Sequence, residues 1–294
     1  PKPQNPFPFL LKFLMDLIWE YFVSGVYSLT DVENNADANG GPRCASQSTF
    51  EFKLMTNLLL LPYELWILRK GWQVLSADFP NRKAALKAQQ NLAPTKIELL
   101  MGIWCTINLI TNCYLKMDNK TLIFMFNPCH VVNLFLIVIS FGRHSRLGEI
   151  CALMVYSFAF GGWIGIIFNE NEGFTNFEHL IYYSEHAFAS FLGPVVLSLA
   201  GRYNMTSYMK YPLPWFGFIL FVLYMRWILM PLSAITWANL NHTLCGLPND
   251  PFFALLDLGK TFYFFSDFYL LFSCMVGNAL NWIIVSAALH IFGS

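Results

Sequence analysis

The sequence predicts an all-α integral membrane protein with about seven transmembrane helices and an N-terminal interfacial helix. Of its 294 residues, 56% are apolar and only 12% are charged, whereas a soluble domain carries about 25% charged residues. The mean hydropathy is +0.46, and long apolar runs recur along the chain. So little polar surface would not cover a water-exposed globule of this size. The 18 basic and 18 acidic residues cancel, so the composition indicates no nucleic-acid partner.

The first apolar stretch, Phe7 to Leu29, is expected to lie on the membrane surface. Lys12, Asp16 and Glu20 interrupt it. On a helix, its charges and rings would alternate between different sides, which is typical of an interfacial helix and not of a membrane span.

Seven later segments have the length and apolar character of transmembrane helices, which need about 20 mainly apolar residues. Their connections are too short for a second folded unit. We therefore expect one polytopic membrane domain over residues 52–294, preceded by an N-terminal interfacial and lumenal segment, residues 1–51. The first span is the weakest, because it is short and contains Pro62 and Glu64. The spans are Phe52 to Leu68, Ile97 to Leu115, Leu122 to Phe141, Leu147 to Phe168, Leu180 to Leu199, Trp215 to Trp237 and Phe262 to Leu289.

Lys and Arg are unevenly distributed over the connections between these spans. They are most frequent in the connection between the first and second spans, and with seven spans that side of the membrane carries the excess. The positive-inside rule places this side in the cytosol. The N-terminus is then expected in the lumen and the C-terminus in the cytosol.

Two cysteines, Cys44 and Cys245, lie outside every predicted span, and both fall on the predicted lumenal side. An oxidising compartment would permit a disulfide between them, which would tie the N-terminal segment to a late loop. The alternative is two free, partly buried thiols.

Polar side chains inside spans are candidates for function, because they are costly in hydrocarbon. Cys129 lies seven residues into the third span and His186 six residues into the fifth. Both are therefore about 10 Å below the predicted lumenal boundary at 1.5 Å per residue. Asn108 of the second span and Asp267 of the seventh lie at a similar depth, so four helices could bring polar groups into one layer.

A Cys and a His at one depth suit a thiol nucleophile. The imidazole takes the thiol proton, the thiolate attacks a carbonyl, and the acyl group rests on sulfur before transfer. Glu185 lies about 100° around the helix from His186, so we expect Asp267 to orient that ring better. Asn133, four residues after Cys129, shares its helix face and could donate a hydrogen bond to an oxyanion.

Local sequence adds supporting residues and alternatives. Pro128 would kink the span beside the thiol. His130, the residue after Cys129, is expected to support the site. Alternatively, the cysteine is a small buried hydrophobe, His186 is an interhelical hydrogen-bonding group, and Asp267 pairs with Arg226. No His-x-x-His, Cys-x-x-Cys or His-Glu-x-x-His pattern occurs, so we expect no metal and no cofactor.

Four stretches of the chain resemble the transmembrane protein 164 family, in the same order and at similar spacing. They are Asn-Gly-Gly-Pro-Arg-Cys ending at Cys44, Asn-Pro-Cys-His-Val-Val from Asn127 to Val132, Tyr-Tyr-x-x-His from Tyr182 to His186, and Asn-Leu-Asn-x-x-Leu-Cys from Asn239 to Cys245, followed by Asp250-Pro251-Phe252. The segment before Asn39 and the last span do not match the family closely.

The resemblance implies a multi-span acyltransferase of endoplasmic reticulum or Golgi-type membranes that moves a fatty acyl chain onto a lyso ether phospholipid. The family's catalytic Cys and His fall on Cys129 and His186. Phospholipids and fatty acyl chains are the implied partners. The Phe-rich N-terminal helix suggests a divergent member. The alternative is therefore a non-catalytic accessory or structural subunit of a larger membrane complex, with other membrane subunits as partners and the mitochondrial inner membrane as its location.

Overall fold

The computed structural model describes residues 12, 15–20, 40–41, 44–45, 49–88, 92–167, 174–209, 213–245 and 262–292, with only the backbone at 88 and 262–270. The regular elements in these ranges are helices, and Gly40 and Ala238 form an isolated antiparallel bridge. Within the predicted interfacial helix, residues 12 and 15–20 are helical, and the rest lies outside the described residues. The all-α class is confirmed for the described part of the chain.

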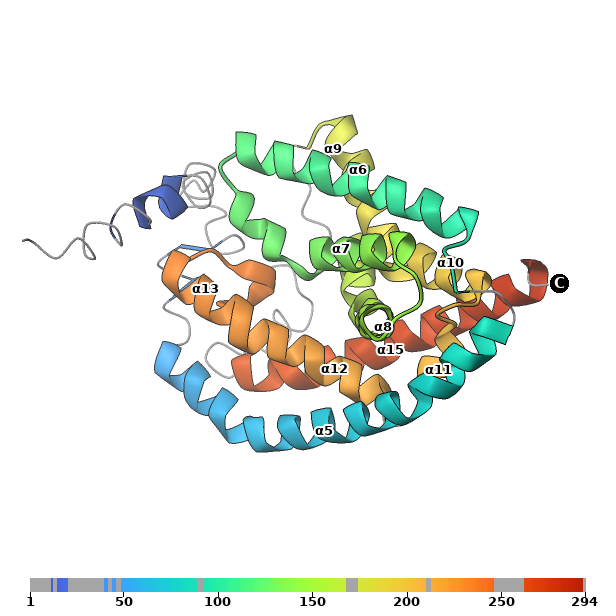
Figure 1. The fold of residues 1–294 in the computed structure, drawn as a ribbon. Coiled ribbons are helices and arrows are strands. Elements are labelled where there is room, and N and C mark those ends of the chain that lie inside the picture. The colour runs from blue at the N-terminus through green and yellow to red at the C-terminus, as the bar shows by residue number, and fades with distance from the viewer. Residues whose placement is uncertain are drawn as a thin grey trace, which may run out of the picture.

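Helix α8 lies at the centre of the molecule and packs against α7, α9, α12 and α15 (Figure 1). Ring contacts fill the α8–α12 interface, with Phe221 4.6 Å from Phe158 and 5.0 Å from Phe160 between centroids. The helices are α5 (Phe50–Ala88), α6 (Lys96–Asp118), η2 (Leu122–Phe126), α7 (Pro128–Phe141), α8 (Arg146–Ile167), α9 (Asn176–Ala187), η3 (Phe188–Leu192), α10 (Gly193–Ala200), α11 (Met205–Tyr208), α12 (Leu213–Tyr224), η4 (Met225–Leu229), α13 (Met230–Thr236), η5 (Leu240–His242) and α15 (Phe262–Phe292).

Four helical segments within the described residues are long and apolar enough to cross a membrane. They are Lys96–Asp118, Arg146–Ile167, Leu213–Thr236 and Leu271–Phe292, which correspond to the predicted second, fourth, sixth and seventh spans. The structure thus supports an integral membrane protein. The other three predicted spans do not meet these criteria of length and apolar character.

The predicted first span is only the first half of α5. This helix has 39 residues and includes Pro62 and Pro80, so it is about 58 Å long, far longer than the ~30 Å hydrocarbon core. It curves along one side of the bundle and packs against α12 (Figure 1).

The predicted third span is divided at Asn127, whose backbone is extended (φ −61°, ψ 145°). A residue before proline disfavours the helical conformation, whereas proline fits the first position of a helix. The expected kink in a continuous span is therefore wrong. Pro128 begins the 14-residue helix α7, and Cys129 lies in its first turn.

The predicted fifth span consists of α9, the π-helical turn η3 and α10. A π turn changes the backbone hydrogen-bond partners, and side chains bond the carbonyls around it. The Ser190 hydroxyl donates to the His186 carbonyl at 2.6 Å. Likewise, Asn57 of α5 donates to the Arg226 carbonyl in the π turn η4 at 3.2 Å.

Buried ion pairs connect helices that are distant in sequence. Arg202, after α10, pairs with Glu98 of α6 at 2.8 Å, with both side chains fully buried. Arg226 pairs with Glu64 of α5, also at 2.8 Å. The alternative pairing of Arg226 with Asp267 is not tested, because the side chain of Asp267 lies outside the described residues.

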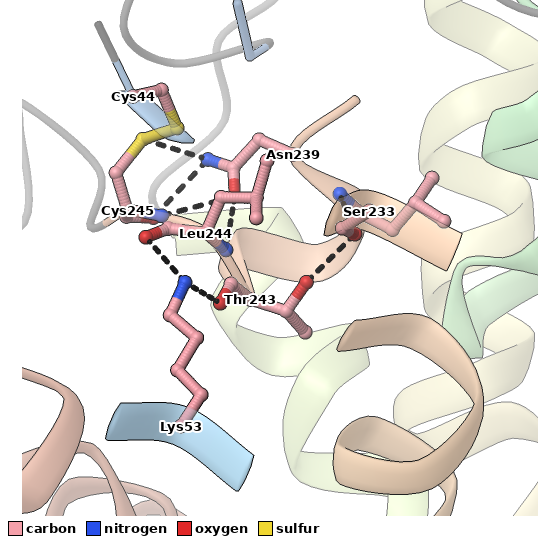
Figure 2. The surroundings of a disulfide bond; sticks show 8 residues. Cys44, Lys53, Ser233, Asn239, Thr243, Leu244 and Cys245 are labelled. Atoms are coloured by element: carbon pink, nitrogen blue, oxygen red, sulfur yellow. Dashed lines mark hydrogen bonds between the residues drawn. A yellow bond between two sulfur atoms is a disulfide. The ribbon is translucent and has the colours of Figure 1, made fainter. Parts of the chain in front are cut away.

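Cys44 and Cys245 form a disulfide, so the N-terminal segment and the late loop are tied together (Figure 2). The loop around it is organised by Asn239, whose side-chain oxygen accepts from the backbone N–H of Leu244 (3.0 Å) and of Cys245 (3.3 Å). From α5, the buried ammonium of Lys53 donates to the Leu244 carbonyl at 3.0 Å. The disulfide holds Cys44 to the loop after α13, and Lys53 holds the start of α5 to the same loop.

Removing this disulfide is expected to lower stability. A Cys44→Ala, Cys245→Ala protein should lose about 2–5 kcal/mol, because the bond links residues 201 positions apart and loss of such a bond leaves the unfolded chain less constrained. The apparent melting temperature in detergent measures the effect. Reductant should lower the melting temperature of the unmodified protein by a similar amount but leave the double variant unchanged. Equal melting temperatures for both oxidised proteins would contradict the prediction.

Candidate functional site

Five polar side chains from three helices meet in the interior of the bundle. We call Asn108 and Asn112 of α6, His130 and Asn133 of α7, and Glu185 of α9 the polar cluster. Asn112 is half-buried, and the other four are at most 5% exposed. Polar groups buried to this degree must hydrogen-bond one another to offset their lost hydration.

Glu185 is the acceptor at the centre of the polar cluster. Its carboxylate accepts from Asn133 at 3.2 Å and from Asn112 at 3.1 Å, and it bonds Nδ1 of His130. A carboxylate accepts only, so Nδ1 of His130 carries the hydrogen and Nε2 keeps its lone pair. His130 is thereby held in the tautomer that can accept a proton.

Asn108 fixes the helices around this carboxylate. Its amide nitrogen donates to the Ile181 carbonyl (3.0 Å) and the Ser184 hydroxyl (2.9 Å) of α9. Its oxygen accepts from Asn112 at 2.8 Å and from Asn133 at 3.4 Å. The register of α6, α7 and α9 is therefore set by side-chain amides.

The thiol of Cys129 lies beside this cluster. Cys129 Sγ, a ring nitrogen of His130 and a carboxylate oxygen of Glu185 are within 4.8 Å of one another. Cys129 is a free, partly exposed cysteine in the first turn of α7. Lys116 of α6 interacts electrostatically with both Cys129 and Glu185, which adds positive charge near the sulfur.

His186 has a different setting. Its Nδ1 donates to the Tyr182 carbonyl at 2.8 Å, and its ring lies 4.0 Å from the Tyr182 ring. It interacts electrostatically with Glu185 and His130. However, the group of donor atoms within 4.8 Å of Cys129 comprises His130 and Glu185 and does not include His186.

The structure thus changes the expected partnerships. Glu185, which seemed poorly placed to orient His186, instead orients His130. Asn133 belongs to the polar cluster and donates a hydrogen bond to Glu185. Asp267 lies on α15, but its side chain is outside the described residues. Asn108 and Asn112, four residues apart on one helix face, were the sequence signal for a buried polar contact on this helix, and Asn112 donates to both Asn108 and Glu185.

The loop with the disulfide reaches this site through Asn127. Its side-chain oxygen accepts from the backbone N–H of Asn241 at 3.1 Å, so the turn before Cys129 rests on the loop. The loop also pairs with Gly40, whose φ is +125° and where a Cβ would lie 2.1 Å from the Trp237 carbonyl oxygen. Burial lowers the pKa of His242 in this loop to about 4, so it is neutral at pH 7.

Cys129, His130 and Glu185 are also residue types that hold zinc, which takes thiolate, imidazole and carboxylate ligands. Zinc binding would require Glu185 and His130 to turn lone pairs towards a common point. In the structure the carboxylate instead accepts directly from His130 Nδ1, and the two groups satisfy each other. This arrangement fits a carboxylate-oriented base better than a metal centre.

Chelation is therefore expected to leave the site intact. After dialysis against EDTA, the reactivity of Cys129 towards iodoacetamide should remain within about twofold of that of the untreated protein, because the thiol and imidazole need no ion. Stoichiometric zinc by elemental analysis, with a change in thiol reactivity on chelation that is reversed by adding zinc, would contradict this.

The fold and the site define a helical membrane protein in which a partly exposed thiol lies within 4.8 Å of a buried imidazole and a buried carboxylate. No protein family model matches the chain, and no solved structure matches it. Membership of the transmembrane protein 164 family therefore stays a prediction from the quoted motifs.

Proposed function

We propose that the protein is a membrane-embedded acyltransferase that carries a fatty acyl group on Cys129 and passes it to a lyso ether phospholipid. One observation supports this most strongly: the Cys129 thiol, a nitrogen of His130 and the Glu185 carboxylate lie within 4.8 Å of one another. Nucleophile, base and orienting group are the three parts that thiol-based acyl transfer requires.

In the first half-reaction, Nε2 of His130 takes the proton of Cys129, and the thiolate attacks the ester carbonyl of a donor lipid. The backbone N–H of Cys129, in the first turn of α7 after Pro128, has no intrahelical acceptor and is suited to bond the oxyanion. When the intermediate collapses, the leaving alkoxide takes the proton from His130, and a thioester remains on Cys129.

In the second half-reaction, His130 takes the proton of the acceptor's hydroxyl, which attacks the thioester carbonyl. The thiolate leaves and regains the proton from His130. Glu185 stabilises the imidazolium in both halves by accepting from Nδ1, as the carboxylate does in hydrolase triads. Because the cluster is buried, exclusion of water favours transfer over hydrolysis.

The proposal includes the finer topology expected from the sequence. The first half of α5, the η2–α7 segment and the α9–α10 segment join the four longer helices as seven membrane-embedded segments. The N-terminus then faces the lumen of an endoplasmic reticulum or Golgi-type membrane. The disulfide supports this placement, because such bonds persist in oxidising compartments.

Detection of the acyl-enzyme tests the proposal. The full chain in detergent is incubated with a phospholipid that carries an alkyne-tagged fatty acyl chain, and the tag is mapped by mass spectrometry. We expect one tagged peptide, containing Cys129, that loses its tag in neutral hydroxylamine because thioesters are cleaved there. Transfer without a tag on Cys129 would refute the mechanism. The absence of both tag and transfer would favour the accessory-subunit alternative.

A pair of glycines on α8 tests His186 without removing it. A Cβ on Gly165 would lie 2.5 Å from Nε2 of His186, whereas a Cβ on Gly161 would have no atom within 4 Å. Gly165→Ala should therefore displace the His186 imidazole, which interacts electrostatically with Glu185 and His130, and so disturb the pair that acts as the base. Acyl transfer should then fall on the order of 100-fold, since a misplacement of about 1 Å is this costly. Gly161→Ala, one turn earlier, should retain full activity. Equal rates for the two variants would show that His186 takes no part.

A further inference from the structure

An apolar groove lies between α5, α8 and the α12–η4 segment. Its volume is about 550 Å³, and its lining includes Leu61, Met154, Leu223, Trp227 and Ile228. This volume lies in the range of pockets that hold small molecules. The one lining residue with a hydroxyl group is Tyr224, so the groove suits a hydrocarbon ligand.

Tyr224 connects the groove to the polar cluster. Its ring lines the groove, while its hydroxyl donates to the backbone carbonyl of Phe126. Phe126 precedes Cys129 by three residues, and Tyr224 and Cys129 are close enough to interact electrostatically. One end of the groove therefore lies against the turn that carries the thiol.

The surroundings of the groove indicate where its ligand comes from. Two of its walls, α8 and α12–η4, belong to segments that are long and apolar enough to cross a membrane, and Ile228 at its edge is 45% exposed. In a bilayer this edge faces lipid. Lipid tails are as apolar as leucine side chains, so the groove selects a chain by its shape and length.

We propose that this groove holds the fatty acyl chain of the donor phospholipid, which enters sideways from the bilayer and places its ester carbonyl at Cys129. The inference rests on the proposed function and adds the element that recognises the substrate. Leu223 and Trp227, on the helix that also carries Tyr224, lie along the path and set the length of chain accepted.

Photolabelling tests the groove independently of catalysis. The full-length Cys129→Ala protein is reconstituted in palmitoyl-oleoyl phosphatidylcholine vesicles with a small fraction of phosphatidylethanolamine whose palmitoyl chain carries a diazirine. We expect the label to concentrate on the peptides of Leu61 and Leu223. In the same background, Leu223→Trp should fill the groove and reduce this labelling at least fivefold.

Ile235→Trp is the matched control, because Ile235 lies on the same span, is 61% exposed and is not part of the groove lining. It should leave the labelling unchanged. Label spread evenly over lipid-facing helices, or crosslinks to a second protein chain instead of lipid, would overturn the inference. Concentrated labelling in a protein that never transfers an acyl chain would refute the proposed function but leave the groove as a lipid site.

In the catalytically intact protein, Leu223→Trp should shift the preference towards shorter acyl chains. The ratio of kcat/KM for a 12-carbon to that for an 18-carbon donor chain should rise at least tenfold, while Ile235→Trp keeps the original ratio. An unchanged ratio in Leu223→Trp would contradict the assignment of the chain to this groove.

Discussion

Cys129→Ala is expected to abolish acyl transfer, with a fall of at least about 10³-fold, because the proposed thioester forms on the Cys129 sulfur and the alanine methyl group is no nucleophile. The variant should remain folded, since the thiol is only partly buried and makes no disulfide. The measurement is transfer of a labelled acyl chain between phospholipids in proteoliposomes, together with the apparent melting temperature.

Cys151→Ala is the matched control for this variant. Cys151 is a buried free cysteine near the start of α8, away from the polar cluster, and its loss should leave transfer within about twofold. The transfer rate of Glu185→Gln should lie between those of Cys129→Ala and Cys151→Ala, because glutamine keeps the shape of glutamate but cannot stabilise the imidazolium of His130. Undiminished transfer by a folded Cys129→Ala protein would rule out the thioester mechanism.

The largest expected effect on stability comes from Arg202→Met. Arg202 bonds the Glu98 carboxylate and also donates to the carbonyls of Ile139 (2.9 Å) and Gly142 (2.8 Å) at the end of α7. Methionine would leave Glu98 buried without its cation and the last carbonyls of α7 without donors. Breaking a buried pair in this way costs about 3–5 kcal/mol, so the apparent melting temperature should fall on the order of 10 °C.

Two further variants show whether the unpaired charge causes this loss. Adding Glu98→Gln to Arg202→Met should restore part of the stability, because a neutral amide is less costly to bury than an unpaired carboxylate. Arg69→Met, at an exposed position on α5, should change the melting temperature by no more than a degree or two. Equal melting temperatures for Arg202→Met and Arg69→Met would show that the buried ion pair does not contribute to stability.

Some of the fold could be predicted from local sequence and some could not. Apolar runs predicted α8 and the α12–α13 segment nearly to their observed ends, the latter in spite of Pro231. The run from Leu122 to Phe141 failed as one span, because hydropathy does not register that Asn127 is extended before Pro128. The first predicted span ended too early, because α5 continues through Pro62 and Pro80 to Ala88 and packs against α12.

The partners of Cys129 show the same limit at the candidate site. Matching depth in the membrane selects residues at the same level, and it brought Cys129, His186 and Asn108 together as candidates. It does not give the rotation of each helix about its axis. Hydrogen bonds from Asn108 to α9 set that rotation, which turns Glu185 towards His130.

The sequence by itself determined the helical membrane class, through its shortage of charge, and singled out Cys129, Cys44 and Cys245 by their positions relative to the apolar runs. Only the tertiary structure decided which imidazole and carboxylate accompany the thiol and where the apolar groove meets it. Hydropathy reports how favourably a segment sits in lipid and is a local property. Side-chain partnership depends on the register and rotation of α6, α7 and α9, which are fixed only when their buried amides satisfy one another.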